Sequence, residues 1–463
     1  MRRRDFLKMA VTGIAAGARG YAFGSTRPAK PNFLFIIADD CTFRDIGCYG
    51  GQAHTPNIDR LASQGMRFTQ CFQAAPMCSP TRHNIYTGLY PVKSGAYPNH
   101  TFVKDGTQSV VQYLKPLGYR VALSGKRHIN PPEVFAFEYS GKDNNPDFEA
   151  IDTFMGQCKA DGTPFCLFAC SNEPHSPWNK GDPSQYDAAT LKLPPYFVDT
   201  NRTRRTMVRY LAEITYFDGQ VGQALALLDK HDLADNTLVI VVSEQGSSFP
   251  FGKWTCYDTG LQSAFIVRWP GKVKPGTVSE ALIEYVDVLP TYIEAAGGTS
   301  PPVLDGKSLL PVLLGRTQDH KEYVFGEMTT RGIIDGSEHF GTRSIRSRRF
   351  KYVWNFTPEV RFQNVCTNSA IFASWRTKAA TDPDAADKVR RYERRPGEEL
   401  YDVAKDPYEW DNLADDPSYA QVKSELRQRL LEWMNAMGDQ GQQTELEAFD
   451  HQTVNRPGTA RPR

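Results

Sequence analysis

The chain has 463 residues, and its 54 lysines and arginines against 53 aspartates and glutamates leave a formal net charge of +1. This balance excludes a protein that coats nucleic acid or another polyanion, because such proteins carry a strong basic excess. A hydrophobic content of 40%, with 12% aromatic residues, excludes wholesale disorder. At roughly 150 residues per domain, the length predicts about three domains, or one large α/β domain with an appendage.

The cysteines and the apolar runs narrow the class of protein further. Nine cysteines are too sparse for a disulfide scaffold, and no CxxC pair indicates a zinc site. Cys166 and Cys170 fall on the same face of an expected strand, where we predict buried thiols. No uncharged apolar run reaches the ~18 residues that cross a membrane, so we expect no membrane anchor.

The N-terminal residues have the pattern of an export signal. Residues 1–8 read MRRRDFLK and precede a short apolar stretch rich in small residues. The segment from Arg3 to Lys8 resembles the twin-arginine signal of bacteria. It predicts a periplasmic or secreted protein that loses about residues 1–25, by cleavage after Ala18 or near Gly24. The other interpretation is a basic N-terminal tail.

Strand and helix patterns alternate through the first two thirds of the chain. Continuous apolar runs predict buried strands at residues 32–38, 165–170 and 237–243, with further strands at 119–123 and 265–268. Helical patterns cover residues 56–64, 107–117, 202–231 and 287–296. This alternation predicts an α/β fold with a large mixed, mostly parallel sheet flanked by helices.

The pattern changes after about Gly315. Short strands are expected at residues 323–327, 342–347 and 350–355, followed by an amphipathic helix at 422–437. These elements predict a smaller C-terminal α+β subdomain at 316–440, after an α/β domain at 26–315. Residues 441–463 form a polar tail, which we expect to be extended over the surface.

Reactive side chains follow four of the expected strands. They are Asp39 and Asp40, Lys126 and His128, Glu173 and His175, and Glu244 and Gln245. Because ligands of an open parallel sheet bind beyond the carboxyl ends of its strands, we expect these side chains on one rim. Their carboxylate and amide oxygens suit Ca²⁺ or Mg²⁺ rather than zinc, and the lysine and histidines suit an oxyanion. A solvated turn is the other interpretation of Asp39-Asp40, but unpaired carboxylates at the end of a buried strand are costly.

Cys78 lies where a short helix is expected to begin. Ser79 is a suitable N-cap, Pro80 fits the first helical position, and Gly88 ends the helix. A helix N-terminus favours an anion, and Arg82 falls on the same side of the helix as Cys78. These residues alone leave two interpretations open, a buried thiol and a nucleophilic thiolate of lowered pKa.

Residues 78–82 read CSPTR and match the C-x-P-x-R signature of type I sulfatases, members of the alkaline-phosphatase superfamily. The resemblance extends in order over residues 30–415. The matching segments are Asp39-Asp40, residues 55–61 (TPNIDRL), Gly125-Lys126-x-His128, Pro174-His175-x-Pro177, Gly252-Lys253-Trp254, residues 287–291 (DVLPT) and residues 399–402 (ELYD). The resemblance implies an alkaline-phosphatase-like fold and a hydrolase of sulfuric esters.

The resemblance also implies a modified residue. In this family the motif cysteine is oxidised to formylglycine, so Cys78 would be converted by a formylglycine-generating maturation enzyme, and the hydrate of the aldehyde would be the nucleophile. The implied catalytic residues are Cys78, Arg82, Lys126, His128, His175 and Lys253. His175 would be the general acid, His128 would accept a proton, and the two lysines would stabilise charge on the sulfuryl oxygens.

The implied metal ligands are Asp39, Asp40, Cys78, Glu244 and Gln245. One pair departs from the family pattern, in which an aspartate is followed by asparagine or histidine, whereas this chain has Glu244-Gln245. Both replacements keep the ligand atoms and add one methylene each. Flexible calcium coordination absorbs that change better than octahedral magnesium does, so calcium is the expected ion.

Two segments bear on the substrate. Residues 125–137 and 195–222 are more similar to heparan N-sulfatase (sulfamidase) than to arylsulfatases generally. They favour a sulfated amino sugar or a related glycan, N-sulfated or O-sulfated, unless they are packing segments shared by a subfamily with mixed substrates. The candidate substrate contacts are His100, Trp178, Tyr257 and Asp258.

Basic residues are concentrated between positions 343 and 351, and two alternative functions remain open. The run consists of Arg343, Arg346, Arg348, Arg349 and Lys351, and predicts either a solvated face of a strand hairpin or a surface that holds a polyanionic chain. The other functions are a phosphonate or phosphoester hydrolase of the same superfamily and a non-catalytic glycan-binding relative. The intact set of Lys126, His128, His175 and Lys253 argues against the non-catalytic relative.

Overall fold

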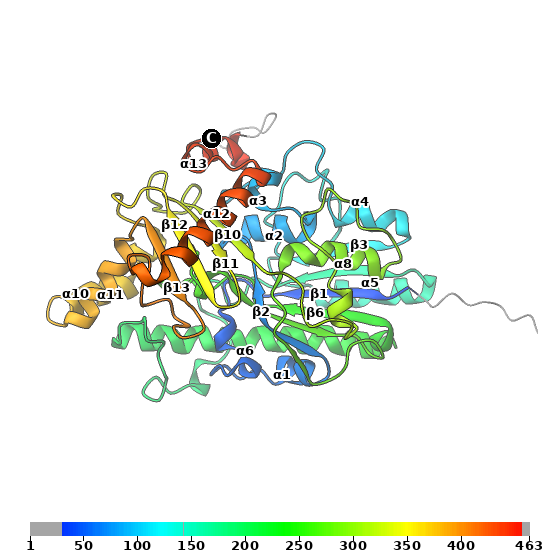
Figure 1. Cartoon of the computed structure of the whole chain (residues 1–463). Helices are drawn as coiled ribbons and strands as arrows, with labels where there is room; N and C mark the ends of the chain where they lie inside the picture. Colours follow the sequence, from blue (N-terminus) through cyan, green and yellow to red (C-terminus); the bar gives the residue numbers. More distant parts are fainter. Residues whose placement is uncertain (1–29, 142, 456–463) are drawn as a thin grey trace, which may run out of the picture.

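Two sheets organise the chain in the computed structural model, which describes residues 30–141 and 143–455 (Figure 1). One is a nine-stranded mixed sheet, and the other is a four-stranded antiparallel sheet. This architecture confirms the predicted α/β class. The predicted export signal lies outside the described residues. Within them, no helix has the length and apolar character that a membrane span requires.

The large sheet is built around a central parallel strand, β1 (Asn32–Ile37), which pairs with β5 and β6. Across the sheet the order is β4 (Glu138–Ser140), β3 (Arg120–Gly125), β5 (Phe165–Cys170), β1, β6 (Thr237–Val242), β7 (Gln262–Arg268), β2 (Met66–Phe72) and β8 (Thr277–Ser279), and β9 (Ile283–Glu284) also pairs with β2. β7 runs antiparallel to both of its neighbours. The carboxyl ends of β3, β5, β1 and β6 therefore meet at one edge.

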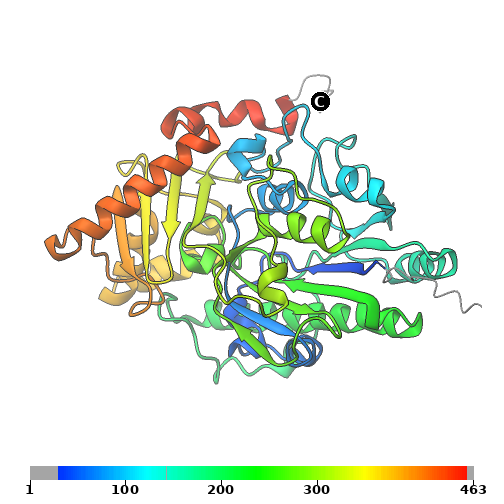
Figure 2. The same ribbon diagram turned by 45° about the vertical axis from the view of Figure 1, so that its right-hand side comes forward.

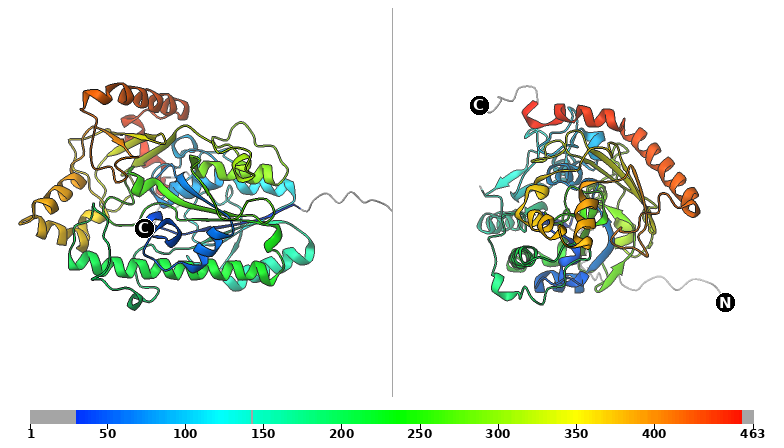
Figure 3. Two further views of the ribbon diagram at one scale, coloured as in Figure 1. Left: turned by 60° about the horizontal axis from the view of Figure 1, so that its bottom comes forward. Right: turned by 90° about the vertical axis from the view of Figure 1, so that its left-hand side faces the viewer.

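Helices cover both faces of the large sheet, which is why its central strands β1, β5 and β6 are buried at every position. Leu34 and Ile36 of β1 pack into the core shared with α6, whereas Phe33, Phe35 and Ile37 pack into the core on the opposite face. Figure 3 shows α6 as a long helix along one side of the sheet. The helices of this part are α1 (Pro56–Ser63), α2 (Cys78–Thr87), α3 (Pro91–Ser94), α4 (Val110–Leu114), α5 (Phe148–Asp161), α6 (Asn201–Lys230), α7 (Asp258–Leu261), α8 (Val288–Ala295) and α9 (Leu310–Leu313).

The small sheet is a meander whose strands are β10 (Val324–Thr329), β11 (Gly341–Arg346), β12 (Phe350–Asn355) and β13 (Glu398–Asp402). The helix α12 (Ala420–Met437) covers one face, where its Leu430 and Trp433 share a core with Tyr352 and Leu400 (Figure 2). Between β12 and β13 the chain forms α10 (Ala370–Ala379) and α11 (Pro383–Glu393), which pack on each other. The sequence pattern did not predict these two helices.

The C-terminal segment is folded, so the expectation of an extended tail is wrong for residues 442–455. This segment forms α13 (Gln442–Glu447) and two 3₁₀ turns. The side chain of Glu445 is buried and accepts a hydrogen bond from Thr329, and Tyr97 donates to the carbonyl of Thr444. These buried polar contacts fix the segment against the small sheet and against the loop after α3.

Most of the basic run is internal. A solvated face and a surface for a polyanionic chain are therefore both wrong for Arg343, Arg346 and Lys351. Arg343 forms a buried ion pair with Asp439. Arg346 and Lys351 both pair with Asp258, and Lys351 also contacts Glu409, in each case with the cation buried. These residues hold the small sheet to its neighbours. Only Arg348 and Arg349 of the run have side chains that are about half exposed.

The Arg343→Gln variant is expected to lose about 3–5 kcal/mol of unfolding free energy, because it leaves Asp439 buried without its cation. Urea unfolding followed by circular dichroism measures this loss. The matched control is Arg348→Gln, whose exposed ion pair with Asp319 contributes at most about 1 kcal/mol. Equal stability of the two variants would contradict the structural role of Arg343.

Candidate functional site

Three of the parallel strands, β1, β3 and β6, deliver polar side chains to one edge of the large sheet. Asp39 and Asp40 follow β1, Lys126 follows β3, and Glu244 follows β6, and all four side chains are buried. Gly125, the last residue of β3, has φ of +96°, and a Cβ there would lie 2.0 Å from the carbonyl oxygen of Cys170. Only glycine lets the chain pass β5 so closely before it presents Lys126.

Cys78 joins the carboxylates. Ligand atoms of Asp39, Asp40, Cys78 and Glu244 all lie within 4.8 Å of one another, and Cys78 is 2% exposed. Gln245 also reaches this cluster, with Nε2 at 2.6 Å from Asp40 Oδ1 and 3.1 Å from Cys78 Sγ. The structure therefore brings together all five residues that the sequence analysis named as metal ligands.

The cluster has the donor set and the free atoms that a hard cation requires. Glu244 Oε2 and Gln245 Oε1 are buried without a hydrogen-bond partner, and Glu244 Oε1 has Arg82 Nε beside it at 3.0 Å. Amide oxygen and nitrogen have nearly the same shape, so a half-turn of the Gln245 amide directs its oxygen at Asp40 and Cys78. Three carboxylates and an amide within this spacing fit calcium, whose oxygen ligands lie at about 2.3–2.6 Å from the ion.

Three cations surround the cluster. Arg82 Nε lies 3.0 Å from Glu244 Oε1, Lys253 Nζ lies 2.7 Å from Asp40 Oδ1, and Lys126 Nζ contacts Asp39. Burial alone would raise the pKa of the Asp40 carboxyl, but Lys253 and His175 hold it below its ordinary value. The Asp40 carboxyl is thus kept charged by its cationic neighbours, whereas burial raises the pKa of Glu244 in spite of Arg82 beside it.

The helix that carries Cys78 begins two residues earlier than predicted. α2 starts at Cys78 itself, so Met77 rather than Ser79 is the N-cap residue, while Gly88 ends the helix in the left-handed conformation as expected. The Ser79 hydroxyl instead donates to the carbonyl of His128 at 3.0 Å. Burial raises the pKa of the Cys78 thiol to about 12, which argues against the unmodified thiolate as the nucleophile.

A cavity of about 660 Å³ opens onto Cys78. Lys126, His128, His175 and Lys253 line it, as do two of the four predicted substrate contacts, His100 and Trp178. His175 Nε2 lies 3.6 Å from Asp40 Oδ2, and His128 Nε2 lies 3.0 Å from His100 Nδ1. The polar end of the cavity thus carries two lysines and three histidines, which suits an anionic group.

The other two predicted contacts lie elsewhere. Asp258 is buried between Arg346 and Lys351, and Tyr257 donates to Glu399. Neither residue lines the cavity at Cys78. Glu173, also named at the strand ends, accepts a hydrogen bond from Asn145 and is absent from the carboxylate cluster. Local sequence cannot separate such internal partners from residues that face a substrate.

Several residues of the cavity were missed by the sequence analysis. Ser248 donates to Asp40 Oδ2 at 2.5 Å, and Trp254, Ile333 and Ile334 supply apolar lining. Ser248 follows Gln245 by three residues, so continuing along the loop after β6 would have found it. The isoleucines come from the loop after β10, which carries no polar signal.

Backbone strain is concentrated around this cavity. Asp40, His100, His128, Glu244 and Trp254 all have φ between 51° and 65°, in the left-handed region that L-residues rarely adopt. Each lies in the carboxylate cluster or lines the cavity beside it. Such conformations persist where the surrounding structure fixes them, and they gather at functional sites.

Known proteins are similar to this chain in sequence and in fold. Residues 31–298 match the family model of sulfatases, and residues 246–363 match the model of the C-terminal part of N-sulphoglucosamine sulphohydrolase. An ulvan-active sulfatase of Formosa agariphila is 38% identical over 423 residues, which cover 89% of this chain and 81% of that protein. Human N-sulphoglucosamine sulphohydrolase is 27% identical over 462 residues, covering 89% of this chain and 91% of that protein.

Solved structures agree on the fold. A structure determined with its substrate D-glucosamine-2-N,6-O-disulfate matches with a TM-score of 0.66 at 20% identity, covering 89% of this chain and 99% of the other. The mixed sheet between helices is the alkaline-phosphatase-like fold expected from the sequence. Because the sulfatase model spans more than half of the chain and a sulfatase of 38% identity spans most of it, the chain belongs to the sulfatase family.

Proposed function

We propose that this sulfatase removes sulfate groups from a sulfated carbohydrate, with a formylglycine made from Cys78 and a bound calcium ion. The observation that carries the proposal is the position of Cys78. Its side chain lies within the cluster of Asp39, Asp40 and Glu244, at the polar end of the 660 Å³ cavity. A buried thiol of raised pKa is a poor nucleophile, whereas an aldehyde hydrate at this position would offer a hydroxyl to an incoming sulfuryl group.

Calcium fits the site, and Asp39, Asp40, Glu244, Gln245 and the modified residue 78 would hold it. When bound, the ion would supply positive charge opposite the sulfuryl oxygens and favour ionisation of the hydroxyl beside it. Three carboxylates face Arg82, Lys126 and Lys253, so protein charges alone nearly cancel. A divalent cation would leave the pocket positive, as recognition of a sulfate ester requires.

The side chains around residue 78 have separate tasks. Lys126 and Lys253 line the cavity and would bind the sulfuryl oxygens as negative charge grows on them. Arg82, fully buried against Glu244, would hold that carboxylate in place. His128 is partly buried, and desolvation together with Lys126 and the other nearby cations keeps its pKa well below the ordinary value. A neutral His128 would be able to accept a proton from the hydrate.

His175 would protonate the leaving oxygen or nitrogen. Asp40 raises its pKa, but burial and the charges of Lys253 and Lys126 outweigh that effect and lower it to about 4. A bound sulfate ester adds negative charge between His175 and the lysines. That charge would raise the pKa of His175 and favour the protonated imidazole. His175 Nδ1 lies 2.7 Å from the carbonyl of Ser176, which leaves Nε2 directed at the site.

The His175→Ala variant is expected to lose about 10²–10⁴-fold in kcat on a sugar sulfate, because its leaving group needs a proton. On an aryl sulfate with an acidic phenol the loss is expected to be below about tenfold, since that phenolate leaves unprotonated. Steady-state rates on the two substrates test this difference, with His54→Ala, an exposed histidine, as the control. An equal loss on both substrates would contradict the role of general acid.

The class of substrate is supported by the relatives and by the cavity. The relatives include a sulfatase active on ulvan and N-sulphoglucosamine sulphohydrolase, and a structure with the same fold holds a disulfated glucosamine. The cavity has apolar walls, including Trp178 and Trp254, beside the polar end, so one side of a sugar ring can pack while its sulfate meets the lysines. We propose a sulfated amino sugar or a related glycan as the substrate.

Sulfate release from paired disaccharides tests the function. One disaccharide carries sulfate only on the glucosamine nitrogen, the other only on oxygen, and Cys78→Ala protein is the control. Release from either disaccharide by the matured wild type supports the proposal and assigns the position of the sulfate. Release from neither, with Cys78 shown to be converted and with turnover of a phosphonate monoester, would replace the proposal by a phosphonate hydrolase.

We also propose that the chain is exported through the twin-arginine route to the periplasm or beyond, on the basis of residues 3–8. Replacement of Arg3 and Arg4 by lysine should retain the protein in the cytoplasm of its host. Fractionation of cells, with immunodetection of the precursor and the shortened form, measures the outcome.

A further inference from the structure

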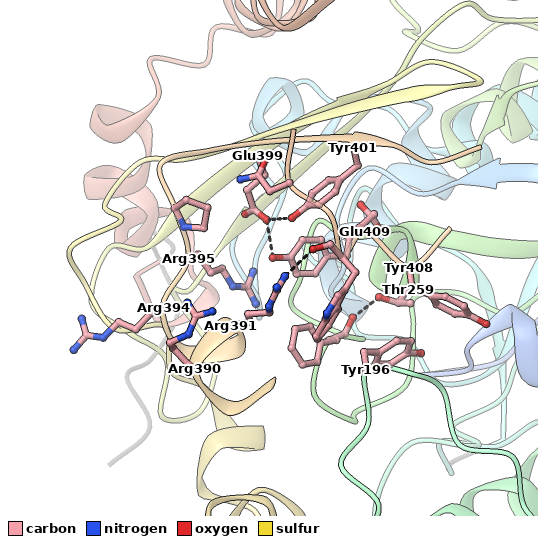
Figure 4. Close-up of a pocket in the computed structure, with 15 residues that line it drawn as sticks. Tyr196, Thr259, Arg390, Arg391, Arg394, Arg395, Glu399, Tyr401, Tyr408 and Glu409 are labelled. Carbon is pink, nitrogen blue, oxygen red and sulfur yellow. Dashed lines mark hydrogen bonds between the residues drawn. The ribbon is translucent and has the colours of Figure 1, made fainter. Parts of the chain in front are cut away.

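A second cavity, of about 380 Å³, lies between the large sheet's loop at residues 249–257 and the segment that joins α11 to β13. We call it the arginine cavity, after the four arginines that line it. Its lining consists of Arg390, Arg391, Arg394 and Arg395, the aromatic residues Tyr196, Phe251, Tyr257, Tyr401, Tyr408 and Trp410, and Thr259, Pro396, Glu399, Glu409 and Asn412. Figure 4 shows the four arginines on one side of the cavity and Tyr408, Thr259 and Tyr196 on the other. No step of the proposed hydrolysis uses these residues.

Arg395 is the unusual member of this group. It is 4% exposed, and its Nε and Nη2 atoms are buried without a hydrogen-bond partner. Within the part of the chain that the structure describes, no carboxylate lies within ion-pair distance of it. Its guanidinium lies 3.8 Å from the ring centroid of Phe362 and 5.1 Å from that of Tyr257. Rings stabilise the face of a guanidinium but do not accept its in-plane N–H groups, so a buried arginine of this kind lacks an anion.

The carboxylates that line the cavity are committed elsewhere. Glu399 accepts hydrogen bonds from Tyr257, Tyr401 and Asn355. Glu409 contacts Lys351 at 2.8 Å and accepts from the backbone of Asp258. Neither carboxylate pairs with Arg395, because Glu399 is held in part by Tyr257 and Tyr401 and Glu409 by Lys351.

The remaining arginines extend the positive surface to the solvent. Arg390 and Arg391 share the single carboxylate of Asp387, and Arg391 also donates to the carbonyl of Trp410. Arg394 is exposed and donates to the carbonyl of Glu359, and among the described residues it has no carboxylate partner. From the surface to Arg395, the arginines of this cavity therefore outnumber the carboxylates that form ion pairs with them.

The arginine cavity is separate from the active site but adjoins it. Phe251 lines the arginine cavity, and Lys253 and Trp254 of the same loop line the cavity at Cys78. One loop thus forms a wall of each. A substrate longer than the sugar at the reaction centre would offer further sulfate or carboxylate groups to such a neighbouring basic site.

We propose that the arginine cavity is a second, non-catalytic site that binds an anionic group of a sulfated saccharide. The choice of ligand rests on the function proposed above, whereas the need for an anion rests on Arg395 alone. The sulfate ester, with three acceptor oxygens, would accept hydrogen bonds from the guanidinium group of Arg395, and Arg394 would contact it from the solvent side. The aromatic and polar walls would contact the sugar ring.

Binding calorimetry on the full chain in the Cys78→Ala form tests this proposal without turnover. The probes are an N-sulfated glucosamine disaccharide, the same disaccharide without sulfate, and inorganic sulfate. We expect two sites for the sulfated disaccharide. Arg395→Gln should abolish one site or weaken it at least about tenfold, as the loss of a charge-assisted hydrogen bond does. Arg429→Gln, an exposed arginine on α12, is the matched control and should leave both sites intact.

The variants distinguish the outcomes. If Arg395→Gln fails to fold by circular dichroism, the surface pair Arg390→Gln/Arg394→Gln keeps the test open, and it should weaken the same site several-fold. A single site in the Cys78→Ala protein, two sites unaffected by either variant, equal binding of the unsulfated disaccharide, or binding of inorganic sulfate alone would each overturn the proposal. Failure of the proposed function has a different signature, the absence of sulfate release by wild-type protein, which this binding experiment does not measure.

Discussion

The Cys78→Ala variant is expected to release sulfate about 10⁴-fold more slowly than matured wild type, or slower still. Among the described residues, the group of Asp39, Asp40, Cys78 and Glu244 reaches the substrate cavity through Cys78, and alanine removes this side chain. Neither a lysine nor a histidine of the cavity could replace it, because each is held by Asp39, Asp40 or His100. Rates of sulfate release from the preferred disaccharide measure the loss.

Two controls make this result specific. Cys48→Ala changes a half-buried cysteine outside the site and should leave the rate unchanged. Mass spectrometry of the peptide that contains residue 78 should show an aldehyde in the wild type from its native host. A wild type that is active with an unmodified Cys78 thiol would refute formylglycine as the nucleophile, and an active Cys78→Ala variant would move the reaction to another residue.

With calcium bound as proposed, a chelator is expected to lower activity by more than about a hundredfold, because the hydroxyl of residue 78 and the sulfuryl oxygens would both lose a positive neighbour. The same treatment should lower the free energy of unfolding by about 3 kcal/mol if calcium was present near one hundred times its Kd. The loss of stability is moderate because Arg82, Lys126 and Lys253 already pair with the buried carboxylates.

Urea unfolding and activity, with and without chelator, measure both effects. Added calcium should restore them, and magnesium should restore less, because the longer side chains of Glu244-Gln245 suit flexible coordination. In Glu244→Gln the unfolding free energy should respond much less to the chelator. Unchanged activity and an unchanged unfolding free energy of the wild type after chelator treatment would show that the cluster of Asp39, Asp40 and Glu244 holds no ion.

The central sheet and its rim were predictable because their signals are local. Residues 165–170 and 350–355 were predicted as strands and form β5 and β12. Buried parallel strands have continuous apolar runs, and their carboxyl ends meet, so Asp39, Lys126 and Glu244 were expected together before any contact was known. β2 was missed because its polar residues interrupt the apolar pattern of a short strand next to the antiparallel β7.

Long-range ion pairs could not be predicted in the same way. Arg343 pairs with Asp439, ninety-six positions away, and Lys351 with Asp258, ninety-three positions away. The sequence of one strand contains the cation but not its distant carboxylate partner. A basic run therefore resembles a solvent-exposed face even where its side chains are buried in ion pairs. The same reason explains why Asp258 was taken for a substrate contact and why the folded segment at 442–455 was expected to be extended.

That folded segment affects the order in which the protein assembles. Thr453 donates from its backbone and from its hydroxyl to the carbonyl of His100, both at 2.8 Å, and His100 in turn contacts His128. During vectorial synthesis, Cys78 and every carboxylate of the cluster are made at least about two hundred residues before Thr453. The side chains of the carboxylate cluster are therefore all synthesised before the wall of the substrate cavity at His100 receives its hydrogen bonds from Thr453.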